Sequence, residues 1–302
     1  MNITSKTTNI TKTDCNNKMA WIFSGLIQSD GSFGISIKRN KSKLSFFITL
    51  FLRVELNIKS LPLIKEMQSF FNCGRVFIRE GRNTCLFEIT DLHSLWHIII
   101  PNFIDYPLYG YKYRSFIKFI KILTLLYPYH NKNKPKLLLA QVIYLGGMIN
   151  FASKRNLEDL SNYYKILNLT VAEIENSLLT LNLDTLIKSR DPLNVYFIIG
   201  LIEGDGSFYI GRGKSKIRFG FSITTHIAEL DLLYQLKRIF NCGNVKIKAK
   251  NWCRYEVEGS SQLNDIFIPL VNSIGLRGSK SIKFAAFKEA MLIYKKNLTL
   301  NR

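Results

Sequence analysis

The segment WIFSGLIQSDGSF at residues 21–33 returns, with few changes, as YFIIGLIEGDGSF at residues 196–208. Each copy is an apolar stretch of helical length that ends in Asp-Gly-Ser-Phe. The shared ending places one acidic residue, Asp30 or Asp205, at the end of each predicted helix. A pattern that occurs twice, far apart in the chain, indicates a duplicated domain and a molecule with approximate twofold symmetry.

Small residues form a stripe along each predicted motif helix. Gly25 and Ser29 are four positions apart in the first copy, as are Gly200 and Gly204 in the second. Residues at this spacing lie on one face of a helix, so the two stripes allow the helices to pack almost backbone to backbone. If the helices pack in this way, their C-terminal ends converge and the two Asp side chains meet at the domain boundary.

The repeat continues through most of both halves. The segment FNCGRV at residues 71–76 matches FNCGNV at residues 240–245, and Gly-Tyr-Lys at 110–112 matches Gly-Ser-Lys at 278–280. Between the two copies lies a stretch with a basic, proline-containing start and predicted helices. The predicted organisation is a flexible tail at 1–17, a first half-domain at 18–127, a linker with helices at 128–193 and a second half-domain at 194–302.

Composition limits the classes of function. A chain of 302 residues, 47% of them hydrophobic, is long enough for two domain cores. Lys and Arg total 42 against 22 acidic residues, a formal net charge of +20, which favours nucleic acid as a partner ahead of an anionic membrane surface. No apolar run reaches the roughly 20 residues that a membrane span needs. The five cysteines contain no Cys-x-x-Cys pair, which indicates buried thiols rather than zinc ligands or disulfides.

Alternating apolar and polar residues predict two-faced strands after each motif helix. From Leu44 to Val54 the even-numbered residues are apolar, and polar side chains stand between them; residues 218–226 alternate in the same way. In two further strands, Ile78 and Ile247 are predicted to face the core. Each half is therefore an α+β unit, with an antiparallel sheet whose apolar face lies under helices and whose basic face stays open.

Helix signals complete the predicted order of elements. Helical stretches are expected at about 60–71, 115–126, 229–240 and 280–296. The motif helices are expected to start near Asn16 and at Asp191-Pro192, where Asp can cap the helix and Pro can occupy its first position. Thr170 and Glu173 form a predicted capping box within the linker.

Two carboxylates that meet at helix C-termini repel each other and lie at the negative ends of the helix dipoles. Divalent cations relieve both problems, and oxygen ligands suit Mg²⁺, which also keeps bound water. Two such ions about 4 Å apart can stabilise the attacking and leaving oxygens of phosphodiester hydrolysis. On a basic, duplicated chain, Asp30 and Asp205 therefore point to metal-dependent cutting of a duplex.

On these residues the chain resembles the LAGLIDADG homing endonucleases of the single-chain, double-motif kind. The residues FSGLIQSDG at 23–31 and IIGLIEGDG at 198–206 match the motif at its Gly, Leu, Ile, final acid and Gly positions. The resemblance implies two αββαββα units with saddle-shaped sheets in the DNA major groove. It implies metal binding by Asp30 and Asp205, without specifying backbone carbonyl ligands, and places Lys112 and Lys280 beside the scissile phosphates as further catalytic residues. It also implies a Mg²⁺-dependent double-strand break with 3′ overhangs.

The sixth motif position is Gln28 in one copy and Glu203 in the other, so neither is predicted to be catalytic. Glu203 is expected to be a helix-surface or capping acid.

DNA contacts are expected from the open sheet faces, where basic residues gather and where the duplex major groove accepts a two-stranded ribbon. Because the halves differ at most of these positions, the target is expected to be long and asymmetric. The candidates are Lys38, Arg39, Lys41, Lys43, Arg53, Arg75, Arg79 and Arg82 in the first half, and Arg212, Lys214, Lys216, Arg218, Ser222, Thr224, Lys246, Lys248, Lys250 and Arg254 in the second.

Two alternatives stay open at this point. An RNA-binding intron maturase, alone or combined with endonuclease activity, can use the same fold and basic faces without needing either Asp. A DNA-binding regulator that does not cut is disfavoured by the retention of both acids. The bias toward Asn, Ile, Lys and Phe suggests AT-rich coding DNA, and with the family resemblance this predicts a monomer acting in a mitochondrion or another organelle, without a membrane partner.

Overall fold

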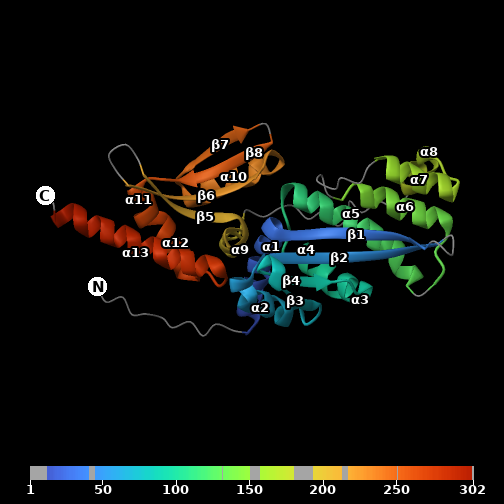
Figure 1. Ribbon diagram of the computed structural model, residues 1–302, viewed down its shortest axis with the longest axis horizontal. Helices are drawn as coiled ribbons and strands as arrows, with labels where there is room; N and C mark the ends of the chain where they lie inside the picture. Colours follow the sequence, from blue (N-terminus) through green and yellow to red (C-terminus); the bar gives the residue numbers. More distant parts are fainter. Residues whose placement is uncertain are drawn as a thin grey trace.

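The computed structural model describes residues 12–40, 45–130, 132–149, 157–179, 193–212, 217–249 and 251–300. Its two halves each contain a four-stranded antiparallel sheet, and the motif helices α1 (Lys12–Asp30) and α9 (Val195–Asp205) lie side by side between the sheets (Figure 1). A single apolar core runs through both halves and the helix contact between them. The fold is therefore the predicted duplicated α+β architecture.

The first half builds its sheet in the order β1-β2-β4-β3. Strands β1 and β2 form a long hairpin in which Gly31 pairs with Val54 and Ile35 with Leu50. Helices α1, α2 and α5 pack on the sheet. The elements after α1 are β1 (Gly31–Asn40), β2 (Ser45–Asn57), η1 (Ile58–Ser60), α2 (Leu61–Phe71), β3 (Arg75–Arg79), η2 (Glu80–Arg82), β4 (Thr84–Ile89), α3 (Leu92–Ser94), η3 (Leu95–Ile99), α4 (Ile100–Asp105), α5 (Gly110–Leu126) and η4 (Tyr127–Tyr129).

The second half repeats this order with the sheet β5-β6-β8-β7. Helices α9, α10 and α13 contact its strands. Asn72 and Asn241 both adopt the left-handed conformation after α2 and α10, which ends these helices at the repeated Asn-Cys-Gly turn. The elements after α9 are β5 (Gly206–Arg212), β6 (Ile217–His226), η6 (Ile227–Glu229), α10 (Leu230–Phe240), β7 (Asn244–Ala249), β8 (Trp252–Val257), α11 (Ser260–Gln262), η7 (Leu263–Phe267), α12 (Ile268–Ile274) and α13 (Ser279–Leu300).

The segment between the halves packs on the first half rather than only connecting the two. Helices α6 (Lys136–Gly147), α7 (Leu157–Leu167) and α8 (Val171–Leu178) form a second small core in which Ile143 and Ile174 are fully buried together with Phe46 of β2. The predicted capping box is present, because Thr170 Oγ1 accepts from Glu173 N (3.3 Å) and the Glu173 carboxylate accepts from Thr170 N (2.8 Å). No described helix combines the length and apolar character of a membrane span.

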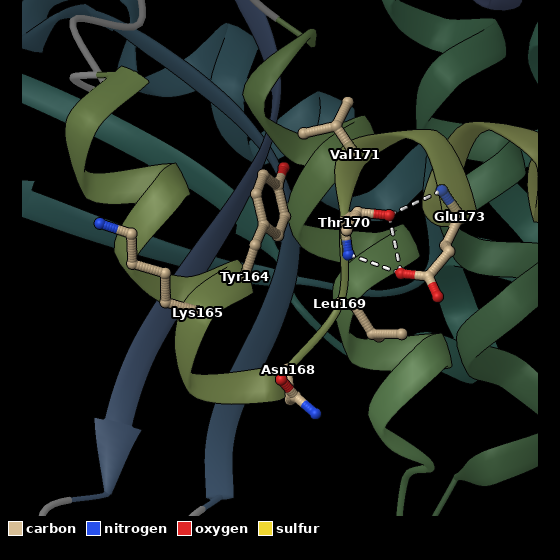
Figure 2. A pocket seen from close by; sticks show the side chains of 7 residues that line it. All are labelled: Tyr164, Lys165, Asn168, Leu169, Thr170, Val171 and Glu173. Carbon is tan, nitrogen blue, oxygen red and sulfur yellow. Dashed lines mark hydrogen bonds between the residues drawn. The ribbon is translucent and has the colours of Figure 1, made fainter.

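Figure 2 shows a surface pocket of about 530 Å³ beside this capping box, between the end of α7 and the start of α8. Thr170 and Glu173 in its wall are hydrogen-bonded to each other, and Tyr164 packs in the small core beneath. Its lining shares no residue with the motif helices that carry the carboxylates.

Several predicted boundaries and faces were wrong. Helix α1 begins at Lys12, so part of the predicted tail is helical. Helix α9 begins after Asn194, whose side chain accepts from Tyr196 N (2.8 Å); the predicted Asp191 cap lies outside the described residues. Ile78 and Ile247, expected in the core, are 55% and 65% exposed. They lie on β3 and β7, each of which is one of the two edge strands of its sheet.

Candidate functional site

The two motif helices touch through their glycines. A Cβ atom on Gly25 of α1 would lie 1.9 Å from the carbonyl oxygen of Phe197, and one on Gly200 of α9 would lie 1.9 Å from that of Ile22. Such distances are impossible for real atoms, so both positions need glycine for the backbones to approach. This symmetric contact confirms the packing predicted from the spacing of small residues.

The contact brings the two carboxylates to the same place. Asp30 and Asp205, at the ends of α1 and α9, are both half-buried, and a Cβ on Gly204 would lie 2.6 Å from Asp30 Oδ2. Burial and, second to it, the negative charge of Asp30 raise the pKa of Asp205 to about 7, although Lys112 and Lys280 oppose the shift. Burial also raises the pKa of Asp30, although Lys280 and Lys112 oppose that shift. The two carboxyl groups therefore repel each other when ionised, and a bound divalent cation would relieve this repulsion.

The two predicted lysines lie at this centre. Lys112, in the first turn of α5, donates from Nζ to the carbonyl of Gly31, and Lys280, in the first turn of α13, donates to that of Gly206. These carbonyls belong to the residues that follow the two Asp. Burial lowers the pKa of Lys112, while Asp205, Glu229 and Asp30 favour its charged form, in that order. Burial lowers the pKa of Lys280 as well.

The residue at the sixth motif position holds the start of the lysine-bearing helix of its own half. Gln28 is buried, and its Oε1 accepts from Tyr109 N (2.9 Å). Glu203, at the equivalent position of α9, accepts from Gly278 N (3.0 Å) and from Arg277 N. Glu203 is 4% exposed, so it is the predicted capping acid but not a helix-surface residue.

The described donor set fits a hard divalent cation only in part. No cluster of three or more His, Cys, Asp or Glu side chains that could hold a metal occurs among the described residues. Two convergent carboxylates with raised pKa values leave positions for water and phosphate oxygens, which Mg²⁺ accepts readily. His93 and His97 pack against each other with tilted rings, at 4.4 Å between ring centroids, and contact the Tyr127 hydroxyl instead. The thiols of Cys73, Cys85, Cys242 and Cys253 are free.

Most candidate DNA-contact residues lie on the open sheet faces. Several already have intramolecular partners, since Arg79 pairs with Glu55 (2.9 Å), Lys248 pairs with Glu256 (3.8 Å), and Arg53 and Lys246 pair with Glu88 and Glu256. Lys38, Arg75, Arg82, Arg212, Arg218, Lys246 and Lys248 are exposed, and Arg53, Arg79, Thr224 and Arg254 are half-buried. Lys41, Lys43, Lys214, Lys216, Lys250 and the side chain of Arg39 lie outside the described residues.

Ser222 departs from the prediction of an open position. It is 3% exposed, because β6 is an inner strand and Ser222 lies between Ser207 of β5 and Glu256 of β8 in the register. Its counterpart in the first half, Arg53, is long enough to pair with Glu88 and to lie over Phe51, with Cζ 3.8 Å from the ring centroid. The short serine side chain stays between its neighbours.

Sequence reasoning missed a pair of residues on the open faces. In the first half Phe51 of β2 lies over Gly34 of β1, and in the second half Tyr209 of β5 lies over Gly220 of β6. A Cβ on either glycine would lie 2.3 Å from the ring. The glycine and the aromatic residue have exchanged strands between the halves. The sequence carried this signal as a glycine in one strand of each hairpin, opposite an aromatic residue in the other.

These features define a class of duplicated α+β proteins with two motif helices at the interface and an open basic sheet in each half. A family model described as LAGLIDADG endonuclease matches residues 23–123 and again residues 198–291. The two matches cover more than half of the chain and include Asp30 and Asp205 at the ends of the motif helices, so the chain belongs to the LAGLIDADG endonuclease family.

Curated relatives and solved structures agree with this assignment. The chain is 28% identical over 277 residues to "Probable intron-encoded endonuclease 2" of Neurospora crassa, covering 90% of this chain but 59% of that protein. It is 24% identical to "Probable intron-encoded DNA endonuclease 1" of Mycosarcoma maydis, covering 85% of this chain and 94% of that protein.

Among solved structures, I-SmaMI bound to an uncleaved DNA target with calcium ions superposes with a TM-score of 0.74 at 21% identity, over 93% of both chains. The LAGLIDADG homing endonuclease I-LtrWI, bound to target DNA, superposes with a TM-score of 0.76 at 21% identity, over 93% of this chain and 92% of that chain. These likenesses establish the fold.

Proposed function

We propose that this protein is a site-specific homing endonuclease that makes a Mg²⁺-dependent double-strand break in DNA. The observation that carries the proposal is the convergence of Asp30, Asp205, Lys112 and Lys280 at the junction of two basic, open sheets. The chain spans 59% of the length of its Neurospora relative, and so the activity is proposed for the centre that this chain contains.

The chemistry of the centre follows from its charges. Bound divalent cations supply charge stabilisation at the oxygens of the scissile phosphate and an activated water. Asp30 and Asp205 would hold these cations and must be ionised to do so. Lys112 and Lys280, held at the neighbouring carbonyls, offset the negative charge that develops on the phosphate.

The open faces support a long, asymmetric DNA target. Each sheet presents exposed basic residues, and the faces differ between the halves at the exchanged Phe51 and Tyr209 and at Arg53 and Ser222. Two sheets joined end to end suit about two helical turns of DNA, roughly 10 bp each. A single chain supplies both halves, which supports action as a monomer. By family resemblance the cuts are staggered across the minor groove and leave 3′ overhangs.

The names of the relatives bear on the origin of the protein. Both curated relatives are called intron-encoded, and we extend that origin, and a place in a mitochondrion or another organelle, to this chain. The half-domains at 18–127 and 194–302 with the segment 128–193 between them remain our proposed organisation. Nothing in the described residues favours the RNA-binding maturase alternative.

The decisive experiment exposes a randomised duplex library to the protein with Mg²⁺ and sequences the cut ends. Wild type should select one long asymmetric site, and Asp30→Asn and Asp205→Asn should each reduce cutting at least about a thousandfold while DNA binding persists. Full cleavage by either variant would remove these residues from the proposed role. Tight, salt-sensitive binding without any cutting by wild type would contradict the endonuclease proposal.

A further inference from the structure

Each lysine-bearing helix begins against a residue of the opposite half. Glu229, at the end of η6 in the second half, accepts at Oε1 from Tyr111 N (2.7 Å) and from Lys112 N (3.3 Å) of α5. Ser60, at the end of η1 in the first half, accepts at Oγ from Ser279 N (2.9 Å) of α13. The start of each lysine-bearing helix is therefore held by a residue of the opposite half as well as by Gln28 or Glu203 of its own half.

The two residues that make these contacts across the interface are equivalent positions of the sequence repeat. Glu229 and Ser60 occupy equivalent positions, each immediately before the helix that leads to the Asn-Cys-Gly turn. The glycine two positions before each lysine leaves room for the side chain that the opposite half contributes, Glu229 or Ser60. A Cβ on Gly110 would lie 2.0 Å from Glu229 Oε2, and one on Gly278 would lie 3.0 Å from Ser60 Oγ. The repeated Gly-x-Lys pattern thus has a physical reason that the sequence alone did not provide.

The position of Glu229 is energetically unfavourable for an ionised carboxyl group. Glu229 is 7% exposed, and its Oε2 has no hydrogen-bond partner among the described residues. Burying a carboxylate in this way is unfavourable unless it is compensated. The compensation comes from the first N–H groups of α5, which lack intrahelical partners and attract negative charge. Tyr109, the N-cap of α5, provides no side-chain cap of its own.

We propose that Glu229 and Ser60 are positioning residues that act across the interface, so that each cutting centre is assembled from both halves. This inference rests on the proposed endonuclease function. Glu229, which makes two hydrogen bonds, has the larger effect, and Ser60, which makes one, has the smaller. In this arrangement the helix that carries Lys112 of the first half begins against Glu229 of the second, and the helix that carries Lys280 of the second half begins against Ser60 of the first.

The test follows the nicking of each strand separately, with the full chain, Mg²⁺ and a duplex target that carries a different label on each strand. Glu229→Ala should slow one strand at least about tenfold more than the other, because a displacement of about 1 Å in Lys112 is enough for such a loss. Lys112→Met should slow the same strand. Ser60→Ala and Lys280→Met should slow the opposite strand, and KM for DNA should stay unchanged in the Glu229 and Ser60 variants.

Two matched variants separate positioning from general stability. Glu229→Gln keeps an oxygen that can accept from both amides and should restore most of the lost rate. Glu66→Ala removes an exposed ion pair with Arg277 (2.8 Å) across the same interface and should bias neither strand. Equal slowing of both strands by Glu229→Ala, or slowing of the strand that Lys112→Met spares, would overturn the inference.

Amide hydrogen exchange in the free protein tests the same contact without any cutting. Exchange at Tyr111 and Lys112 should accelerate in Glu229→Ala and stay slow in Glu229→Gln, while Ser279 is unaffected. Unchanged exchange at Tyr111 and Lys112 would overturn the inference even if DNA is cut normally. A wild type that cuts no duplex would instead overturn the proposed function, and the exchange result would still decide the contact.

Discussion

Gly25 of α1 and Gly200 of α9 have equivalent environments, because each lies against a backbone carbonyl of the other motif helix. The hairpins that follow these helices do not match in this way. In the first half the aromatic residue Phe51 stands on β2, whereas in the second half Tyr209 stands on β5. The centre of the molecule has kept its twofold symmetry while the surfaces that face outward have diverged.

This difference indicates which parts of the fold are constrained by geometry. At the helix contact, any side chain larger than hydrogen would separate the helices, and both carboxylates depend on their approach. On the open faces a change alters only the surface offered to a partner. A symmetric centre with dissimilar faces is the combination that the proposed cutting of two chemically equivalent phosphates within one asymmetric sequence would use.

The largest expected effect comes from breaking the symmetric contact. Gly25→Ala and Gly200→Ala should each lower the free energy of unfolding by about 3 kcal/mol or more, because the added methyl group forces the backbones apart. The losses should be similar in the two halves, and denaturant unfolding measures them. Gly81→Ala is the control, since a Cβ at that position meets nothing within 4 Å. A loss at only one of the two positions would show that the contact is less symmetric than the structure indicates.

A smaller effect, on how the free energy of unfolding depends on pH, should distinguish Asp205 from Asp30. Burial and, second to it, the negative charge of Asp30 raise the pKa of Asp205 from 3.8 to about 7. The folded state therefore binds this proton more tightly than the unfolded state, and stability present below about pH 4 is lost as the pH rises through 7. The loss should be about 2 kcal/mol after allowance for solvent screening of a half-buried group, a fall of a few degrees in Tm.

Thermal unfolding in EDTA between pH 4 and 8 measures this loss. Asp205→Asn should reduce the pH dependence, and the remainder should come from the other buried carboxyls whose pKa values are raised, Asp30, Glu203 and Glu229. Asp30→Asn should move the contribution of Asp205 to lower pH because the repulsion from Asp30 disappears. Mg²⁺ should raise Tm most at high pH, where both carboxylates are ionised. A Tm that does not depend on pH in this range would contradict the assigned charge state of the centre.

The sequence was sufficient where one physical signal determined the structure. The repeated Gly spacing predicted the helix contact, and the alternation from Leu44 to Val54 predicted a strand with one buried face. It was insufficient where a side chain acts across the interface. Glu229 lies far from Lys112 in the chain, and its role depends on how the two halves pack. The exposure of Ile247 likewise depends on its place on an outer strand, which alternation does not reveal.

The smallest effect should appear on the divergent faces, as a change of DNA preference rather than of stability. Phe51→Ala removes the ring that supports the Arg53 guanidinium, and Tyr209→Ala removes the ring whose hydroxyl donates to Glu258 Oε1 (3.0 Å). Each should reduce discrimination between bases by about tenfold, or roughly 1.4 kcal/mol, at positions in one half of the target only.

Relative binding across all single-base variants of the target measures this preference. The double substitution Gly34→Tyr with Phe51→Gly rebuilds the second-half arrangement in the first half, where the glycine again leaves room for the facing ring. It should keep the fold while losing the first-half base preference, which separates recognition from packing. If Phe51→Ala changed preference equally in both halves of the target, the exchanged aromatic residues could not be what makes the two faces read different sequences.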